Sequence, residues 1–482
     1  MDKKISVVTN LLWRFLERCG AQLVGFVVSV VLARLLEPSL YGTVALITAI
    51  TTILQVFVDS GMGSALIQKK DSDDLDFSSV FYFNLVFCLV LYAGLFIAAP
   101  LLARAYHDLS LTPLIRVLGL VVVVSGVKNV QQAYVSKTLQ FRRFFFATLG
   151  GTLFSAVLGI VLAYLGAGVW ALVAQQLSNA AVNTAILWLT VGWKPKREFS
   201  FQRLGALISY GWKILVSALM DTLYLKGYQL IIGLRYSEAD LAFFNRADQL
   251  PNLVVDNVNA SIDSVLLPVL SGAQDDPAQV REMTRRAIKT STYIMLPLMV
   301  GLAVCARPVI RLLLTEKWLP CVPYLQILCL VYAFWPVHTA NLQAINAQGR
   351  SDLFLKLEIL KKISGLLFLL LALPYGIIFM LILKTVNEFV CAFINAFSNK
   401  KLLDYGFGRQ LIDMLPSFLC SLIMGAAVYA VSFTSLTGIA LLAVQILTGI
   451  VTYIIMSLLM NRKLISELFS MIKPVLARSD KS

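Results

Sequence analysis

Apolar stretches of about twenty residues follow one another along almost the whole chain, separated by short polar loops. A helix of that length spans the roughly 30 Å hydrocarbon core of a bilayer. A water-soluble domain carries about a quarter charged residues, whereas here only 14% are charged and 58% are hydrophobic. The sequence therefore predicts an all-α polytopic membrane protein with about 14 transmembrane helices.

The loops between these helices suggest how they are grouped. The longest cytoplasmic connection before the tail, roughly Gly192–Ala206, separates six predicted spans from the next six. We therefore predict an N-lobe (helices 1–6) at residues 1–192, a cytoplasmic inter-lobe linker at 193–206, a C-lobe (helices 7–12) at 207–400, helices 13 and 14 at 401–460, and a cytoplasmic tail at 461–482. The tail contains an apolar stripe flanked by lysines, which predicts an amphipathic helix on the inner leaflet. A partly disordered basic tail is the alternative.

Charge and the rarer residue types limit the possible functions. Most Lys and Arg residues lie in loops on the same side as the N-terminus, a positive-inside pattern that predicts a multi-pass protein with both termini in the cytoplasm. Because location explains the net charge of +14, we expect no nucleic-acid partner. The seven cysteines have no paired spacing, and His107 and His338 are the only imidazoles. We therefore expect no disulfide framework, metal centre or cofactor.

The stretch from Lys213 to Ser271 is too polar for simple membrane anchors. It predicts two helices, near Trp212–Arg235 and Asp240–Ser271. The first carries Lys213, Asp221 and Lys226. On a helical wheel of the second, one broad face collects seven polar residues: Arg246, Gln249, Asn252, Asp256, Asn257, Asp263 and Ser264. Ionisable groups at membrane depth cost roughly 2.5–3.5 kcal/mol each and usually face an interior pathway. The alternative is internal pairing, Asp221 with Lys226 and Asp256 with Arg246.

Other predicted spans carry polar stripes of the same kind. Their members are Arg14, Glu17, Arg18 and Gln22 in the first span, Thr48, Thr51, Thr52, Gln55 and Asp59 in the second, Gln176, Asn179 and Asn183 in the sixth, and Lys384, Asn387 and Glu388 in the twelfth. Because lipid cannot satisfy polar groups, these faces are expected to converge on a shared interior. The Thr, Asn and Gln stripes predict hydrogen bonds between helices. For the cations, binding and structural pairing both stay open. Lys128 lies near the end of the fourth span, where snorkelling explains it.

Several short runs together resemble the Wzx-like oligosaccharide flippases of the MOP superfamily, in the branch that serves lipopolysaccharide biosynthesis. The runs are Leu32–Gly42, Asp59–Gln68, Gly166–Gln175, Phe244–Asp248, Pro268–Ser271 and Gly349–Ser351. The resemblance implies a MATE-like fold, a V of two six-helix lobes with two added C-terminal helices. It also implies a transporter, not an enzyme, that moves a polyprenyl-diphosphate-linked oligosaccharide across the bacterial inner membrane. Membrane lipids and glycan polymerase machinery are the expected partners.

A lipid-linked sugar diphosphate requires cations for its phosphates and polar groups for its hydroxyls. Arginine suits phosphate because its guanidinium offers paired donors. We expect Arg18 and Arg246 to bind the diphosphate, with Arg14, Lys213, Lys226 and Gln249 as further substrate-binding candidates. The candidate acids Asp59, Asp221, Asp256 and Asp263 either bind a coupling ion or hold the cations in place. The six-plus-six division further suggests alternating access.

Two other functions remain open. An ion-coupled multidrug exporter of the same fold would have an interior richer in carboxylates than in cations. A membrane glycan polymerase or ligase would need a large external loop to hold the acceptor, and the predicted external loops are short.

Overall fold

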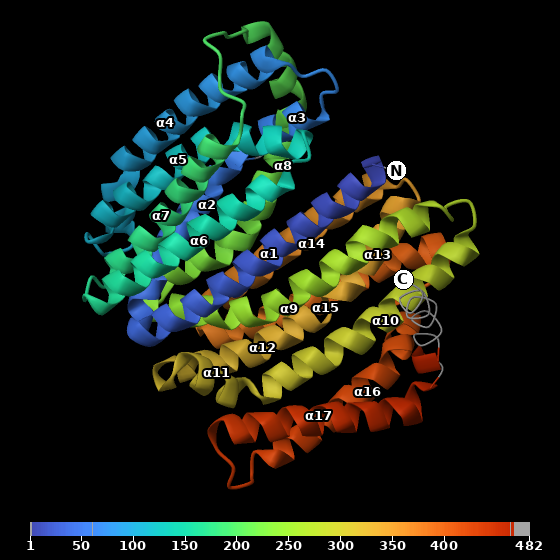
Figure 1. Ribbon diagram of the computed structural model, residues 1–482. Helices are drawn as coiled ribbons and strands as arrows, with labels where there is room; N and C mark the ends of the chain where they lie inside the picture. The colour runs from blue at the N-terminus through green and yellow to red at the C-terminus, as the bar shows by residue number, and fades with distance from the viewer. Residues whose placement is uncertain (1, 60, 463, 467–482) are drawn as a thin grey trace. The chain divides into compact units, whose positions relative to one another are not determined.

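A computed structural model describes residues 2–59, 61–462 and 464–466, with side chains for all of these except 2–12, 14–19, 210, 260, 261, 263–265 and 351. The described residues form seventeen α-helices and two short 3₁₀ helices, with no β-strand among them (Figure 1). The predicted all-α fold is confirmed. Of the predicted amphipathic tail helix, Leu468, Phe469 and Ile472 lie outside the described residues.

The helices are long and apolar enough to make this a multi-pass membrane protein. Within the described residues, nine candidate spans pass on length and hydropathy, and a tenth is added if the bent helix α8 (Phe201–Arg235) counts as one. Four further long helices coincide with predicted spans: α1 (Asp2–Leu35), α7 (Val169–Thr190), α9 (Glu238–Ser271) and α14 (Ser351–Ala372). This arrangement is consistent with about 14 spans, a number that stays a prediction.

The chain divides into two compact units, residues 1–242 and 243–482. The first unit also contains α2 (Pro38–Asp59), α3 (Met62–Gln68), α4 (Asp74–Ala105), α5 (Leu111–Lys137) and α6 (Phe141–Tyr164). The second contains α10 (Pro277–Val304), α11 (Ala306–Leu314), η1 (Glu316–Cys321), α12 (Val322–Ala333), α13 (Trp335–Ala347), η2 (Leu373–Tyr375), α15 (Ile377–Leu403), α16 (Phe407–Val431) and α17 (Gly438–Met460). Helix α9 begins in the first unit and continues into the second. The predicted lobe boundaries stay a prediction.

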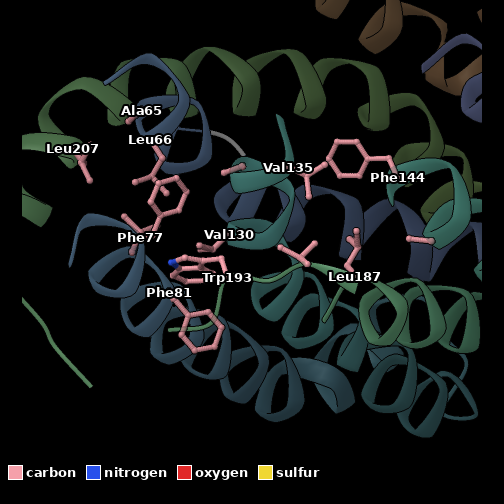
Figure 2. Packing of buried hydrophobic residues seen from close by; sticks show 14 of the residues in the cluster. Ala65, Leu66, Phe77, Phe81, Val130, Val135, Phe144, Leu187, Trp193 and Leu207 are labelled. Carbon is pink, nitrogen blue, oxygen red and sulfur yellow. The ribbon is translucent and has the colours of Figure 1, made fainter. Parts of the chain in front are cut away.

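The core of the first unit is built around the connection that follows α7. Trp193 is 5% exposed and packs against Phe77 and other apolar side chains of α4, as Figure 2 shows. Its indole N–H donates to Asp74 at 3.1 Å, and its carbonyl accepts from the Gln131 amide at 3.1 Å. The backbone N–H groups of Lys196 and Ser200 donate to serine hydroxyls of α4, each at 3.0 Å. The extended segment 191–200 is therefore fixed to α4 and α5.

In the second unit, α10 packs along α16, and α16 and α17 form an antiparallel pair (Figure 1). One end of the α10–α16 contact is closed by a charged network. Asp413 of α16 accepts two hydrogen bonds from the Arg285 guanidinium, at 2.7 and 2.8 Å, and lies 3.0 Å from the Lys289 amine. Tyr405 donates to the same carboxylate at 2.9 Å. Such bidentate Arg–carboxylate pairs fix geometry as well as charge.

Two glycines allow close approaches in the first unit. Helix α8 bends by 48° between Ser209 and Gly211. At the bend the Gly211 backbone touches that of Gly61, where an added Cβ would lie 2.6 Å from the Gly211 carbonyl oxygen. Gly61 also has a φ of 103°, which side-chain-bearing residues rarely adopt. The close approach of the two backbones therefore requires a glycine at both positions, 61 and 211.

Helix α4 begins with a complete capping box. The Asp73 side chain accepts from the Asp76 backbone N–H at 3.0 Å, and the Asp76 side chain accepts from the Asp73 N–H at 3.2 Å. Arg203 of α8 lies 2.6 Å from the Asp73 carboxylate. The backbone hydrogen bond from Asp76, followed by the Arg203 guanidinium, holds the pKa of Asp73 below its usual value. The charge of Asp73 thus stabilises the folded state.

We expect the Asp73→Asn variant to unfold about 1–2 °C below the wild type at pH 7, because asparagine keeps the cap but loses the charge. The folded pKa of Asp73 is lowered, so its contribution is present above the unfolded value of about 3.9 and disappears as the pH falls through the folded value. The difference in unfolding temperature should therefore shrink below about pH 4. Thermal unfolding of the detergent-solubilised protein measures this, with the exposed Asp71→Asn as control. A constant difference down to pH 3 would contradict a charge effect.

Candidate functional site

The first unit contains a polar pocket enclosed by α2, α5 and α7. Its volume is about 330 Å³. It is lined by Thr48, Thr51, Thr52, Gln55, Asp59, Val121, Ser125, Lys128, Gln176, Asn179, Ala180 and Asn183. The polar stripes predicted for the second and sixth spans therefore face the same cavity. Hydroxyl and amide groups dominate its wall.

The hydrogen bonds along this wall leave several acceptors available on residues that line the pocket. The Thr48 hydroxyl lies 3.1 Å from Gln176 Oε1, which confirms the predicted bonding between these two stripes. The hydroxyls of Thr51 and Thr52 donate to the Thr48 carbonyl oxygen, at 3.1 and 2.6 Å, so their oxygens remain able to accept. Oδ1 of Asn183 is buried without a hydrogen-bond partner among the described residues. A buried unsatisfied acceptor favours a ligand that donates hydrogen bonds.

Two charged groups also line the pocket. Asp59 of α2 accepts from the Asn129 amide at 3.3 Å, and Lys128 of α5 lies on the same wall. Snorkelling is therefore the wrong interpretation of Lys128, because its side chain faces an internal cavity. The sequence did contain a signal for this position. Val121, Ser125 and Lys128 are spaced four and three residues apart, which places them on one face of a helix.

In the second unit, α9 brings Arg246 and Gln249 together. Arg246 is 8% exposed, its Nη1 donates to Gln249 Oε1 at 2.7 Å, and its guanidinium carbon lies 5.5 Å from the centre of the Trp318 ring. A guanidinium over an indole face is stabilised by a cation–π interaction. The alternative interpretation pairs Arg246 with Asp256, but ten residues of continuous helix separate them by about 15 Å, and Asp256 is exposed. That pairing is wrong.

A second set of polar side chains lies between α9, near Arg246, and the helices α12 and α15. Tyr332 donates to Asp248 Oδ1 at 2.6 Å, and the Asn252 amide donates to Oδ2 at 3.1 Å. The Lys384 amine lies 5.9 Å from the ring centres of both Phe244 and Tyr332. Sequence reasoning missed the pair of Asp248 and Tyr332 because a helical wheel describes one helix at a time. It cannot show which residue of another helix packs against it. The described contacts join α9, α12 and α15 through the buried Tyr332 and partly buried polar groups.

The other predicted site residues are distributed differently. Lys213 and Asp221 of α8 are exposed, and Lys226 is partly buried. Asp221 and Lys226 are five residues apart, so they project from different sides of α8. The side chains of Arg14, Arg18 and Asp263 lie outside the described residues. That these six residues contact the substrate or a coupling ion stays a prediction.

The arrangement suits non-covalent recognition. Arg246 and Lys384 are cations held against aromatic rings, a setting in which a phosphate or carboxylate can be bound by charge-assisted hydrogen bonds. The pocket of the first unit presents hydroxyls and amides, which match the donors and acceptors of a sugar. Both groups lie on helices of a membrane protein, where polar side chains usually mark a substrate pathway.

Solved structures show which fold this chain has. The lipid II flippase MurJ, in an inward closed conformation, matches with a TM-score of 0.78 at 17% identity, covering 94% of this chain and 100% of that one. An inward-facing multidrug resistance MATE family transporter of the MOP superfamily matches with a TM-score of 0.60 at 15% identity, covering 86% and 96%. The chain has the fold of the MOP superfamily, as the resemblance implied.

The sequence profile of the polysaccharide biosynthesis protein family matches residues 31–323, more than half of the chain. The chain belongs to this family.

Curated relatives agree with this membership. The succinoglycan biosynthesis transport protein ExoT of Rhizobium meliloti (strain 1021) is 25% identical over 325 residues, 67% of this chain and 66% of that protein. The teichuronic acid biosynthesis protein TuaB of Bacillus subtilis (strain 168) is 24% identical over 84% of this chain and 85% of its own length. The lipopolysaccharide biosynthesis protein WzxC of Escherichia coli (strain K12) is 24% identical over 70% and 69%. The match with ExoT thus spans just under two thirds of that protein.

Proposed function

We propose that this protein flips a polyprenyl-diphosphate-linked oligosaccharide across the bacterial inner membrane, for lipopolysaccharide, exopolysaccharide or a related surface glycan. The observation that carries the proposal is the hydroxyl- and amide-lined pocket of about 330 Å³, within the helices of a chain from the polysaccharide biosynthesis protein family. The names of the relatives support it, because ExoT is a biosynthesis transport protein and MurJ a lipid II flippase.

The pocket of the first unit is the proposed sugar site. Its volume lies at the lower end of the roughly 300–1,000 Å³ range of small-molecule sites, which suits one sugar residue of a longer glycan. Sugar hydroxyls can donate to the unsatisfied Oδ1 of Asn183 and accept from the Asn179 amide. Lys128 adds a cation that suits an acidic sugar or a phosphate.

Arg246 with Gln249 is proposed to bind the diphosphate, and Arg18, Arg14, Lys213 and Lys226 are proposed as further substrate-binding residues. The acids Asp59, Asp221, Asp256 and Asp263 are proposed to bind a coupling ion or to hold cations in place, apart from the Asp256–Arg246 pair excluded above. We further propose a transporter without enzymatic activity that works by alternating access, with both termini in the cytoplasm. Membrane lipids are its environment, and glycan polymerase machinery is the proposed partner.

The two alternatives are less favoured. A multidrug exporter for cationic compounds would need an interior richer in carboxylates than in cations, whereas the pocket lining contains one of each, Asp59 and Lys128. No observation on the described residues favours a polymerase or ligase.

Deletion of the gene tests the proposed function. The lipid-linked oligosaccharide should accumulate on the cytoplasmic face of the inner membrane, and the surface glycan should disappear, because the step between them is blocked. Mass spectrometry of extracted lipids and glycan staining of intact cells measure both, and the wild-type gene should restore both. Unchanged lipid-linked and surface pools would overturn the proposal.

Complementation with a pocket variant tests the sugar site in the same strain. Asn183→Leu should reduce surface glycan about tenfold relative to the wild-type gene, since one or two hydrogen bonds of about 1 kcal/mol each are lost. Thr190→Leu is the matched control, because Thr190 lies on the same helix but is exposed and bonds only within α7. Equal glycan levels with both variants would argue against the pocket.

A further inference from the structure

His338 is a buried histidine inside the second unit. It lies on α13, is 7% exposed, and is one of only two histidines in the chain. Oε2 of Glu388, on α15, is 3.2 Å from its Nε2 atom. The Asn395 amide, also on α15, is 3.2 Å from its Nδ1 atom. The imidazole is thus held between a carboxylate and an amide.

These three side chains can accommodate either protonation state of the imidazole. With the Asn395 amide nitrogen towards Nδ1, that atom accepts a hydrogen bond and the ring is neutral, with its proton on Nε2 beside Glu388. If the amide turns over, its oxygen can accept from a protonated Nδ1, and Nε2 keeps its proton. Asn395 Oδ1 and His338 Nε2 are both buried without an aligned hydrogen-bond partner among the described residues. A second proton on the ring would therefore gain a partner.

The groups around the pair are nearly balanced in charge. Those that face Glu388 are Lys384 and Cys391 of α15, Lys361 and Glu358 of α14, and Tyr332 of α12. Lys361 forms an ion pair with Glu358, and Tyr332 donates to Asp248 of α9. Lys384 also acts on Glu388, from one helical turn away on α15. Adding a proton to His338 changes the net charge of an otherwise compensated cluster.

Lys384 and Tyr332 connect the neighbourhood of this pair to α9, the helix that carries the proposed diphosphate site. Lys384 lies over the Tyr332 ring, Tyr332 donates to Asp248, and Asp248 is two residues from Arg246 on α9. When the imidazole is charged, Glu388 is attracted to it as well as to Lys384, and the imidazolium repels Lys384. A shift of Lys384 would change its contact with the Tyr332 ring and, through the hydrogen bond from Tyr332 to Asp248, would act on α9.

We propose that His338 and Glu388 form a proton-binding site that supplies the coupling ion for transport. One proton adds to the Nδ1 lone pair from water on one side of the membrane and leaves to water on the other, with no other bond made or broken. The inference rests on the proposed function and assigns the coupling ion to residues other than the acids considered above.

Direct titration of His338 tests proton binding without any transport assay. The His107→Gln variant leaves His338 as the sole histidine, because His107 is exposed in the loop after α4. With ¹⁵N-labelled histidine in lipid nanodiscs, the NMR signals of the ring nitrogens should change from the neutral to the imidazolium pattern as the pH is lowered. A ring that keeps one protonation state at every pH at which the protein stays folded would overturn the proposal.

Transport in proteoliposomes tests the coupling. The probe is the lipid-linked oligosaccharide extracted from the deletion strain. A transmembrane pH gradient should accelerate its flipping by the wild type and by the His107→Gln control, whereas His338→Gln and Glu388→Gln should show a gradient-to-no-gradient rate ratio near one. Asn395→Leu should lower the ratio too, because it removes the amide that can hydrogen-bond Nδ1 in both the neutral and the protonated state of the imidazole.

A retained ratio in His338→Gln, or no acceleration of the wild type, would overturn the proposal. If the wild type flips no probe at all, the proposed function fails, and the NMR titration still decides whether His338 binds a proton.

Discussion

Replacing Arg246 with alanine should reduce export of the lipid-linked sugar roughly 10- to 100-fold while leaving the protein in the membrane. The expected loss corresponds to about 1.5–3 kcal/mol for a hydrogen bond to a charged group. Arg246 is buried, bonded to Gln249 and held against Trp318, so the guanidinium is pre-positioned to bind a phosphate. Surface glycan and membrane-inserted protein are measured in the complemented deletion strain.

Two further variants separate charge from geometry at this position. Arg246→Lys keeps the charge but loses the planar fork, so it should restore only part of the export. Arg307→Ala is the control, because Arg307 is an exposed arginine of the second unit, on α11. Normal export with Arg246→Ala would contradict the proposed role. Reduced export together with loss of the protein from the membrane would instead indicate a structural role.

Replacing Gly42 with alanine should destabilise the first unit by about 3 kcal/mol or more, at the upper end of the range for overpacking. A Cβ on Gly42 would lie 1.7 Å from the backbone carbonyl oxygen of Glu238, so α2 and the start of α9 would have to separate. Their separation would also break the 2.8 Å hydrogen bond from Thr43 to Glu238. The unfolding temperature and the yield of monodisperse protein in detergent measure the effect.

Gly94→Ala is the matched control for Gly42→Ala. Gly94 lies inside α4, and a Cβ there meets nothing within 4 Å. Alanine is favoured over glycine in a helix by about 0.5–1 kcal/mol, so this variant should be neutral or slightly stabilised. If both variants unfold at the wild-type temperature, the contact between Gly42 and Glu238 is not required for packing.

The membrane class and the polar stripes could be predicted from sequence because they depend on local periodicity. The stripes of Thr48 to Asp59 and of Gln176 to Asn183 each repeat with the helical period. Lipid cannot satisfy a polar helix face, so such a face must pack against another polar face of the protein. Their meeting in one pocket therefore follows from the two patterns together. The same reasoning predicted the ends of α8 and α9 at Arg235 and Ser271, as observed, but it placed the start of α8 at Trp212, eleven residues after the observed start at Phe201.

Contacts between distant helices could not be predicted from those patterns. Lys128 was assigned to the membrane surface because sequence position alone does not show which neighbour covers a side chain. The link between Asp248 and Tyr332 joins residues 84 positions apart, and His338 meets Glu388 from a different helix. The Arg246–Asp256 pairing failed for a simpler reason, since a shared helical face does not bring residues ten positions apart into reach.

The anchored segment 191–200 has a practical consequence for measuring these activities. A fluorescent protein or an affinity tag inserted there would displace Trp193 and break its contacts with Asp74 and Gln131, although the sequence suggests a tolerant linker. The turn between α16 and α17, residues 432–437, is almost wholly exposed and forms few contacts. A reporter for the single-molecule or flow-cytometry assays that follow glycan export is better placed in that turn.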